Sequence, residues 1–118
     1  MKIFTKEYLV TSDQTAFAMG SGDLEVLATP ALVAMMENCS KELLTGYLTA
    51  EQTSVGFSLE LKHLAPSKVG AVIQVTAEIT KQTERKVLFL IQAFQQEQLI
   101  GQALHQRVVV KKATFLKN

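Results

Sequence analysis

The sequence predicts an α+β domain in which one long helix packs against an antiparallel sheet. Residues 26–44, VLATPALVAMMENCSKELL, carry apolar side chains at helical spacing. Residues 53–65 instead alternate apolar and polar side chains, which is the period of a strand with one buried face. Further segments of strand period follow, joined by links of hairpin length, so antiparallel pairing is expected.

The chain is expected to begin with a strand over residues 2–10, followed by an irregular link rich in turn-forming residues. The helix is predicted to start at Thr29 and Pro30, because a threonine hydroxyl can cap free backbone N–H groups and proline suits the first helical turn. Its end is expected near Gly46 or Leu48.

The predicted helix carries an acid on its apolar face. At about 100° per residue, one continuous arc contains Leu32, Val33, Met36, Leu43, Leu44, Tyr47 and Leu48. Glu37 falls inside this arc. The face expected to meet water carries Asn38, Glu42 and Thr45. A carboxylate taken out of water without a partner costs several kcal/mol or has its pKa raised. An ion pair with Lys41, one turn further on, is the simplest structural explanation of Glu37.

The strand after the helix places a histidine on its apolar face. The side chains expected to be buried are Val55, Phe57, Leu59 and Leu61, and His63 shares their side. A helix packed on a sheet buries its apolar arc against the apolar face of the strands, so Glu37 and His63 are expected to point into the same layer. A carboxylate and an imidazole in one layer can shift each other's pKa toward neutrality, as general acid–base catalysis requires. A lone strand histidine is otherwise more often structural.

Three more strands complete the predicted sheet. Residues 71–80 share one apolar face, and the stretch LIGQALHQRVVVKK supplies the last strand. Between them, residues 87–94 are apolar on both sides, so this strand is expected to be central or to lie against another subunit. The whole chain, residues 1–118, is predicted to form a single domain.

The composition is that of a soluble globular protein. Of its 118 residues, 47% are apolar and 19% are charged, and no apolar run approaches the ~20 residues of a membrane span. A net charge of +1 without a basic cluster gives no reason to expect nucleic-acid binding. The start MKIFTKEYLV lacks the apolar run of a signal peptide, and the single cysteine, Cys39, cannot form an internal disulfide. Both features favour the cytoplasm.

Three motifs in the sequence resemble the fluoroacetyl-CoA-specific thioesterase-like family of hot-dog fold proteins. The first, VLATPALVAMMEN, contains Thr29 and Glu37. The second, TSVGFSLELKHLAPSKVG, contains Gly56 and His63, and the third, GQALHQR, ends at Arg107. The motifs follow the family's order and span most of the chain.

This resemblance implies a hot-dog fold, in which a long central helix is wrapped by a curved antiparallel β-sheet, and a homodimer whose sheets pair. It implies catalytic roles for Thr29, Glu37 and His63, with Gly56 and Arg107 as supporting substrate-binding positions. No metal or cofactor is expected beyond the CoA thioester substrate. For Arg107, an exposed strand residue paired with a carboxylate is the structural alternative.

The expected function is that of a cytoplasmic acyl-CoA thioesterase that hydrolyses a small acyl thioester to the free acid and CoA. His63 is expected to move the proton, Glu37 to attack directly or to activate water, and Thr29 to position the acyl group or the water. One alternative is a non-catalytic module of the same fold that binds acyl-CoA or an apolar small molecule. A cystatin-like interaction domain is another, but it does not account for two titratable residues in the buried layer.

Overall fold

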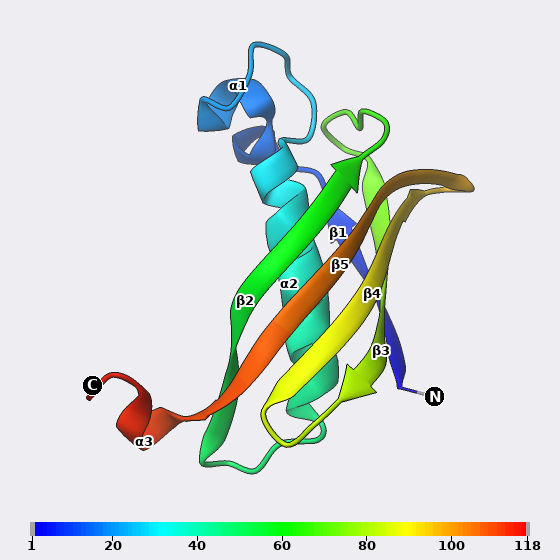
Figure 1. The fold of residues 1–118 in the computed structure, drawn as a ribbon. Coiled ribbons are helices and arrows are strands. Elements are labelled where there is room, and N and C mark those ends of the chain that lie inside the picture. Colours follow the sequence, from blue (N-terminus) through cyan, green and yellow to red (C-terminus); the bar gives the residue numbers. More distant parts are fainter. Residues whose placement is uncertain (1, 118) are drawn as a thin grey trace.

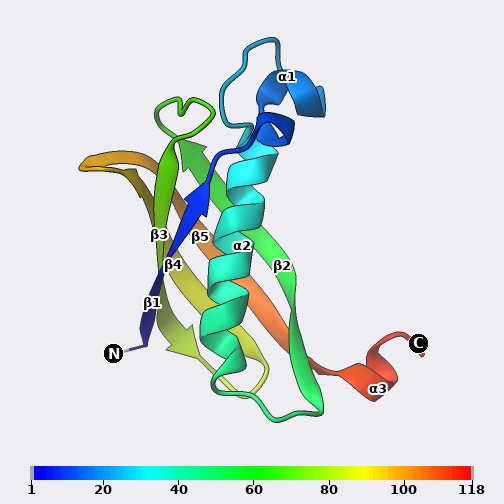
Figure 2. The same cartoon turned by 180° about the vertical axis from the view of Figure 1, so that it is seen from behind.

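The computed structural model describes residues 2–117, which form a five-stranded antiparallel sheet and one long helix. In chain order, the elements are β1 (Ile3–Leu9), the 3-10 turn η1 (Ser12–Gln14), α1 (Ala16–Met19), α2 (Thr29–Thr45), β2 (Gln52–His63), β3 (Val72–Gln82), β4 (Lys86–Gln95), β5 (Gln98–Lys111) and α3 (Lys112–Phe115). The strand order across the sheet is β1-β3-β4-β5-β2. The curved sheet wraps around α2, which crosses its concave face (Figures 1 and 2). The predicted order of one strand, one helix and four strands is confirmed.

The start of α2 differs from the prediction in one respect that matters for the site. Its N-cap residue is Ala28, and no side chain caps the free N–H groups. Thr29 is already the first helical residue, so its side chain lies beside the helix end rather than over those N–H groups. The predicted capping role of the Thr29 hydroxyl is therefore wrong. The helix ends at Thr45, with Gly46 as its C-cap, close to the expected place.

The buried face of α2 is rotated relative to the predicted arc. It consists of Ala31, Leu32, Met35, Met36, Cys39, Ser40, Leu43 and Leu44. Tyr47, predicted to be buried, is 51% exposed. Asn38 and Glu42, predicted to face water, instead contact β1, because β1 lies along that side of the helix. Glu37 lies on the other edge of the buried face, beside Gly56 of β2.

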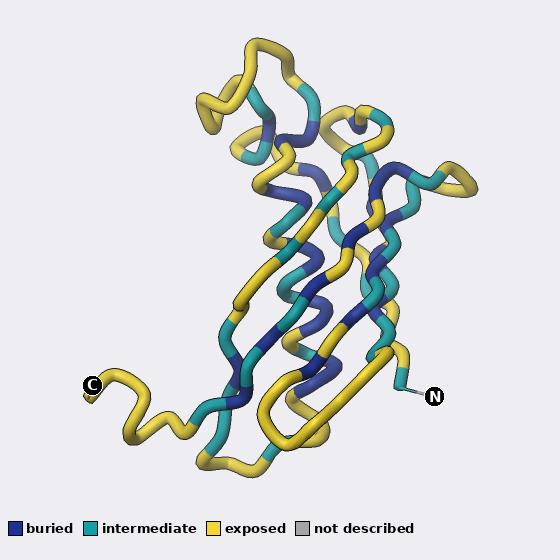
Figure 3. The backbone as a smooth tube through the Cα atoms, viewed as in Figure 1, coloured by how far each residue is buried: buried dark blue, intermediate teal, exposed yellow. Residues whose placement is uncertain are grey.

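A β-bulge changes which side chains of β2 face the helix. The pairing register of β2 with β5 shifts between Gly56 and Ser58. Before the bulge Ser54 is buried, whereas after it Leu59 and the other odd-numbered side chains turn inward. Phe57, predicted to be buried, is 71% exposed. The middle of β2 is correspondingly coloured yellow, for exposed residues, in Figure 3.

The strand order leaves β2 at the edge of the sheet and β4 at its centre. The central position of β4 confirms the prediction for residues 87–94. Its inward side chains Val87, Phe89 and Ile91 are buried, while Leu88 on the outward face is 36% exposed. In residues 2–117, β2 pairs only with β5, so its outer edge has no strand beside it. No helix in this described part of the chain is long and apolar enough to cross a membrane.

Candidate active site

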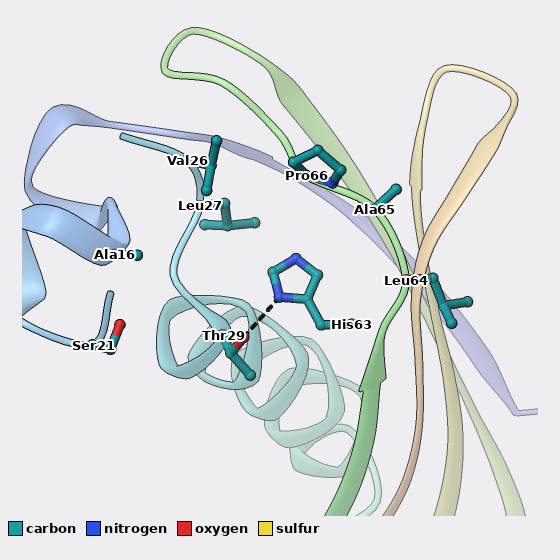
Figure 4. Close-up of a pocket in the computed structure, with 9 residues that line it drawn as sticks. All are labelled: Ala16, Ser21, Val26, Leu27, Thr29, His63, Leu64, Ala65 and Pro66. Carbon is teal, nitrogen blue, oxygen red and sulfur yellow. Dashed lines mark hydrogen bonds between the residues drawn. The ribbon is translucent and has the colours of Figure 1, made fainter. Parts of the chain in front are cut away.

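The hydroxyl of Thr29 and the ring of His63 meet where α2 begins and β2 ends. Thr29 Oγ1 lies 2.9 Å from His63 Nδ1, a hydrogen-bond distance (Figure 4). The two side chains line a cavity of about 360 Å³ whose walls are mostly apolar and include Leu27 and Pro66. Because the Thr29 hydroxyl does not cap the helix, it is available to orient the His63 ring.

The surroundings of His63 favour its neutral form. Burial lowers the pKa of His63 below its usual range, so the ring is uncharged at neutral pH. Its other nitrogen, Nε2, is buried and makes no hydrogen bond within the described residues. When Nδ1–H donates to the Thr29 oxygen, Nε2 carries a free lone pair, which is the form in which a histidine accepts a proton.

A second group lies further along α2 and β2. Glu37 Oε2 is 3.8 Å from Arg107 Nη1, and the Glu37 side chain is 42% exposed. Lys41 is exposed on the helix, and the ion pair found for Glu37 within residues 2–117 is with Arg107. The predicted pair of Glu37 with Lys41 is therefore wrong, because β5 supplies a cation that the helix sequence alone does not reveal.

Gly56 allows the carboxylate of Glu37 to approach the strand. A Cβ atom built on Gly56 lies 2.5 Å from Glu37 Oε2, well inside the contact distance of real Cβ atoms. Any side chain at this position displaces the carboxylate or the backbone. Glycine is needed here for close approach, with no unusual backbone angle involved.

Arg107 is buried and held by three contacts. Its side chain is only 8% exposed, which rules out the exposed-strand alternative. Its Nε donates to the Ser54 hydroxyl at 2.8 Å and its Nη2 to the Ser54 carbonyl at 3.1 Å. Its Nη1 lies 3.2 Å from His105 Nε2. The guanidinium is thus fixed with Nη1 directed toward Glu37.

The protonation of His105 follows from its neighbours. Its Nδ1 lies 2.8 Å from the Ser58 carbonyl oxygen, which can only accept, so Nδ1 carries the proton and Nε2 accepts from Arg107. Burial, more than the nearby Arg107 charge, lowers the pKa of His105, so the ring stays neutral near pH 7. The ring also stacks on Phe89 at 5.8 Å between centroids.

His105 was not among the predicted site residues. Alternate strand residues share a face, so the spacing of His105 and Arg107 in the motif GQALHQR was a signal that could have found it. The acceptor for its Nδ1–H could not have been found, because the Ser58 carbonyl is turned toward it at the β2 bulge.

The structure places the five predicted site residues in two groups. Thr29 and His63 form one group, and Glu37, Gly56 and Arg107 form the other. Thr29 and Glu37 are separated by ~12 Å along the helix axis, and no hydrogen bond or ion pair within residues 2–117 joins Glu37 to His63. Within this part of the chain, no cluster of three or more His, Cys, Asp or Glu side chains could hold a metal ion.

The fold is similar to that of solved hot-dog proteins. A hot-dog-like protein from Thermanaerovibrio acidaminovorans superposes with a TM-score of 0.88 at 23% identity, covering 98% of this chain and 85% of that one. A mutant of the fluoroacetyl-CoA-specific thioesterase FlK, crystallised with fluoroacetate and CoA, superposes with a TM-score of 0.90 at 25% identity, covering 96% and 95%. The chain has the hot-dog fold of the thioesterases.

The sequence comparisons define the family more narrowly. The model of the fluoroacetyl-CoA-specific thioesterase family matches residues 10–113. The fluoroacetyl-CoA thioesterase of Streptantibioticus cattleyicolor is 29% identical over 91 residues, 77% of this chain and 66% of that protein. The match thus spans slightly less than two thirds of that relative's length. The chain belongs to the fluoroacetyl-CoA-specific thioesterase family, a family of thioester hydrolases, which confirms the resemblance of the three motifs.

Proposed function

We propose that the protein is a cytoplasmic acyl-CoA thioesterase that hydrolyses a small acyl thioester to the free acid and CoA. The observation that carries the proposal is the Thr29–His63 hydrogen bond in a largely apolar cavity. It provides an oriented, neutral histidine next to a space that suits a short acyl group. Family membership supplies the reaction class.

The two groups of site residues come together if two chains pair along their β2 strands. In an antiparallel pair related by a two-fold axis, residues whose numbers have a constant sum lie opposite each other. An axis midway between Gly56 and His63 sets His63 of one protomer opposite Gly56 of its partner. Each site then combines Thr29 and His63 of one protomer with the partner's Glu37, Gly56 and Arg107. The unpaired edge of β2 and the exposed Phe57 support this arrangement.

In this composite site each side chain has a role. Glu37 attacks the thioester carbonyl directly or removes a proton from an attacking water, and the C–S bond breaks as a C–O bond forms. His63 accepts at its free Nε2 the proton released by the water that attacks the thioester, or by the water that hydrolyses a Glu37 anhydride, and returns a proton to the thiolate. A backbone N–H near Gly56 and the fixed Arg107 guanidinium stabilise the oxyanion. Thr29 holds the imidazole and the acyl group in place.

Release of free thiol from acetyl-CoA and a panel of short acyl-CoA esters, followed with a thiol reagent, tests the function. The only cysteine, Cys39, is fully buried, so the reagent reports the product rather than the protein. Turnover by the wild type that is lost in His63→Ala supports the thioesterase. Saturable acyl-CoA binding without thiol release supports instead the non-catalytic module.

A further inference from the structure

The fold gathers cations from two separate segments at one end of the molecule. Residues 81–86 and 111–117 carry six of the chain's 12 lysines and arginines, namely Lys81, Arg85, Lys86, Lys111, Lys112 and Lys117. The Val109 amide donates to the Arg85 carbonyl at 2.7 Å, which joins the β3–β4 turn to the end of β5. Figure 1 shows this turn and α3 at the same end of the sheet. No basic cluster is visible in the sequence, because about 25 residues separate the two segments.

These cations outnumber the acidic side chains around them and form no ion pair within the described residues. The acidic side chains among the neighbouring residues are Glu51 and Glu84, whereas the rest of the chain carries more acidic than basic side chains. The ion pairs within 4.0 Å in residues 2–117 are Lys6–Glu42 and Arg107–Glu37, and neither uses a cation from this end. The charge of the molecule is therefore segregated, with an excess of positive charge at the end of β5.

The basic end contains a cavity lined by residues from the start of β2, the β3–β4 turn and the end of β5. The cavity has a volume of about 400 Å³, and its polar lining consists of two cations, Arg85 and Lys111, one acid, Glu84, and the uncharged Gln52 and Thr114. Lys111 follows Arg107 and the buried Val109 at alternate positions of β5, so its side chain starts from the same, helix-facing side of the strand.

The distance from the active site matches the length of a CoA arm. Gly56 pairs with Arg107, and Gln52 pairs with Lys111, so the basic end lies four residues from the proposed oxyanion site on both strands, or ~13 Å. The pantetheine arm between the sulfur and the nucleotide has about twelve backbone bonds, equivalent to roughly four residues of extended chain, or ~14 Å.

We propose that the basic end, centred on Arg85 and Lys111, binds the phosphate groups of the CoA nucleotide. The identity of this ligand rests on the proposed thioesterase function. The cations hold the nucleotide at the end of β5 while the pantetheine arm follows β2 to the thioester at Gly56. The same charges attract the polyanionic substrate from solution.

Kinetics with acetyl-CoA and acetyl-pantetheine test the site, because the second substrate has the same thioester without the nucleotide. The variants are Arg85→Glu and Lys111→Glu, and Lys62→Glu on the outward face of β2 is the matched charge control. Each variant at the basic end is expected to raise KM for acetyl-CoA about tenfold and to leave KM for acetyl-pantetheine and kcat unchanged. Lys62→Glu leaves KM for both substrates unchanged.

Calorimetric binding of CoA and of pantetheine separates this inference from the catalytic one. If the protein hydrolyses neither substrate, but Arg85→Glu and Lys111→Glu weaken CoA binding relative to Lys62→Glu, the phosphate site stands and the hydrolase function fails. If acetyl-CoA is hydrolysed with the same KM by all variants, the function stands and the phosphate site is overturned. Equal CoA binding by wild type and variants, or no CoA binding at all, also overturns it.

Discussion

Polar side chains on the two long edges of α2 differ in how completely they are paired with the neighbouring strand. On the edge next to β1, Lys6 Nζ lies 2.6 Å from Glu42 Oε2, and Tyr8 donates to Asn38 at 2.6 Å. Lys6 also donates to Asn38 at 3.1 Å. Each polar group on this edge has a close partner in a strand that packs beside the helix, so these contacts anchor β1.

On the edge next to β2 the contacts are longer and less complete. Glu37 is 3.8 Å from its cation, and the strand opposite it carries glycine rather than a side chain. His63 has one ring nitrogen bonded to Thr29 and the other without a partner in the described residues. The strand on this side is also the edge of the sheet.

This contrast separates polar groups on one helix that suit a structural role from those that suit a catalytic one. Polar groups that a neighbouring strand satisfies completely are structural, because any further ligand must break a short hydrogen bond. Polar groups that are held in place but keep free hydrogen-bonding capacity can act on a substrate. Glu37 and Glu42 are the same residue type, and they differ in that Glu37 lies beside the open edge of the sheet whereas Glu42 is paired with β1.

Replacing one glutamate on each edge is expected to give the largest effect. Glu37→Gln keeps the shape of the side chain but removes its charge and basicity, so kcat is expected to fall at least 100-fold, about the size of a lost acid–base group. Glu42→Gln weakens the contact with Lys6 and is expected to keep wild-type kcat with a slightly lower Tm. Thiol release and thermal unfolding measure both. Full activity in Glu37→Gln would show that Glu37 is structural and not catalytic.

Mixing two inactive variants tests whether the open edge is completed by a second chain. His63→Ala and Glu37→Gln are each expected to be inactive as homodimers. A heterodimer of the two holds one intact composite site, so random mixing by co-expression restores about a quarter of wild-type activity. Light scattering should give twice the 13.0 kDa chain mass. A 13.0 kDa species with full activity, or no restoration in verified heterodimers, contradicts the shared site.

Substituting the glycine opposite Glu37 is expected to have a smaller but clear effect. The new Cβ of Gly56→Ala meets Glu37 Oε2 at 2.5 Å and pushes the carboxylate away from Arg107. A misplaced catalytic group of this kind is expected to lower kcat by roughly 30-fold. Gly46→Ala is the control, since its nearest contact would be an ordinary 3.6 Å. Equal kcat in both variants would show that the closeness of Gly56 to Glu37 is unimportant.

Local patterns in the sequence predicted most of the fold and singled out two of the candidate site residues. Helical and strand periods set the order of the elements, and the polar residues on apolar faces pointed to Glu37 and His63. The bulge after Gly56 was not predictable from the alternation of apolar and polar residues. An extra residue in the strand leaves that alternation unchanged, but it exchanges the side chains that face the helix for those that face away from it. The pairing of Glu37 with Arg107 was not predictable either, since it depends on how β5 and β2 align.

Two substitutions of His105 separate its contacts. His105→Gln can still accept from Arg107 at the position of Nε2, whereas His105→Asn can still donate to the Ser58 carbonyl but no longer reaches Arg107. We expect His105→Asn to lower kcat about tenfold with little change in KM, and His105→Gln to recover most of that loss. The same kcat in both variants, with equal Tm, would mean that His105 only fills space.

The smallest expected effect is on the pH dependence of stability. Burial lowers the pKa of His105 below its ordinary 6.5, so the unfolded chain binds a proton that the folded chain excludes. The stability that neutral His105 contributes is complete above pH 6.5 and is lost as pH falls toward the folded pKa, by at most about 1.4 kcal/mol per pH unit for one proton. His63 behaves in the same way, for the same reason. His105→Gln has no proton to gain at this position, so its Tm is expected to fall less steeply than that of the wild type as pH is lowered below 6.5, by roughly 6 °C per pH unit at most. Carboxylates titrate mainly at lower pH and contribute equally in both proteins. Parallel Tm curves for wild type and variant would show that His105 takes up its proton equally readily in the folded and the unfolded chain, and the hydrogen bond from Arg107 to its Nε2 would then have to be abandoned.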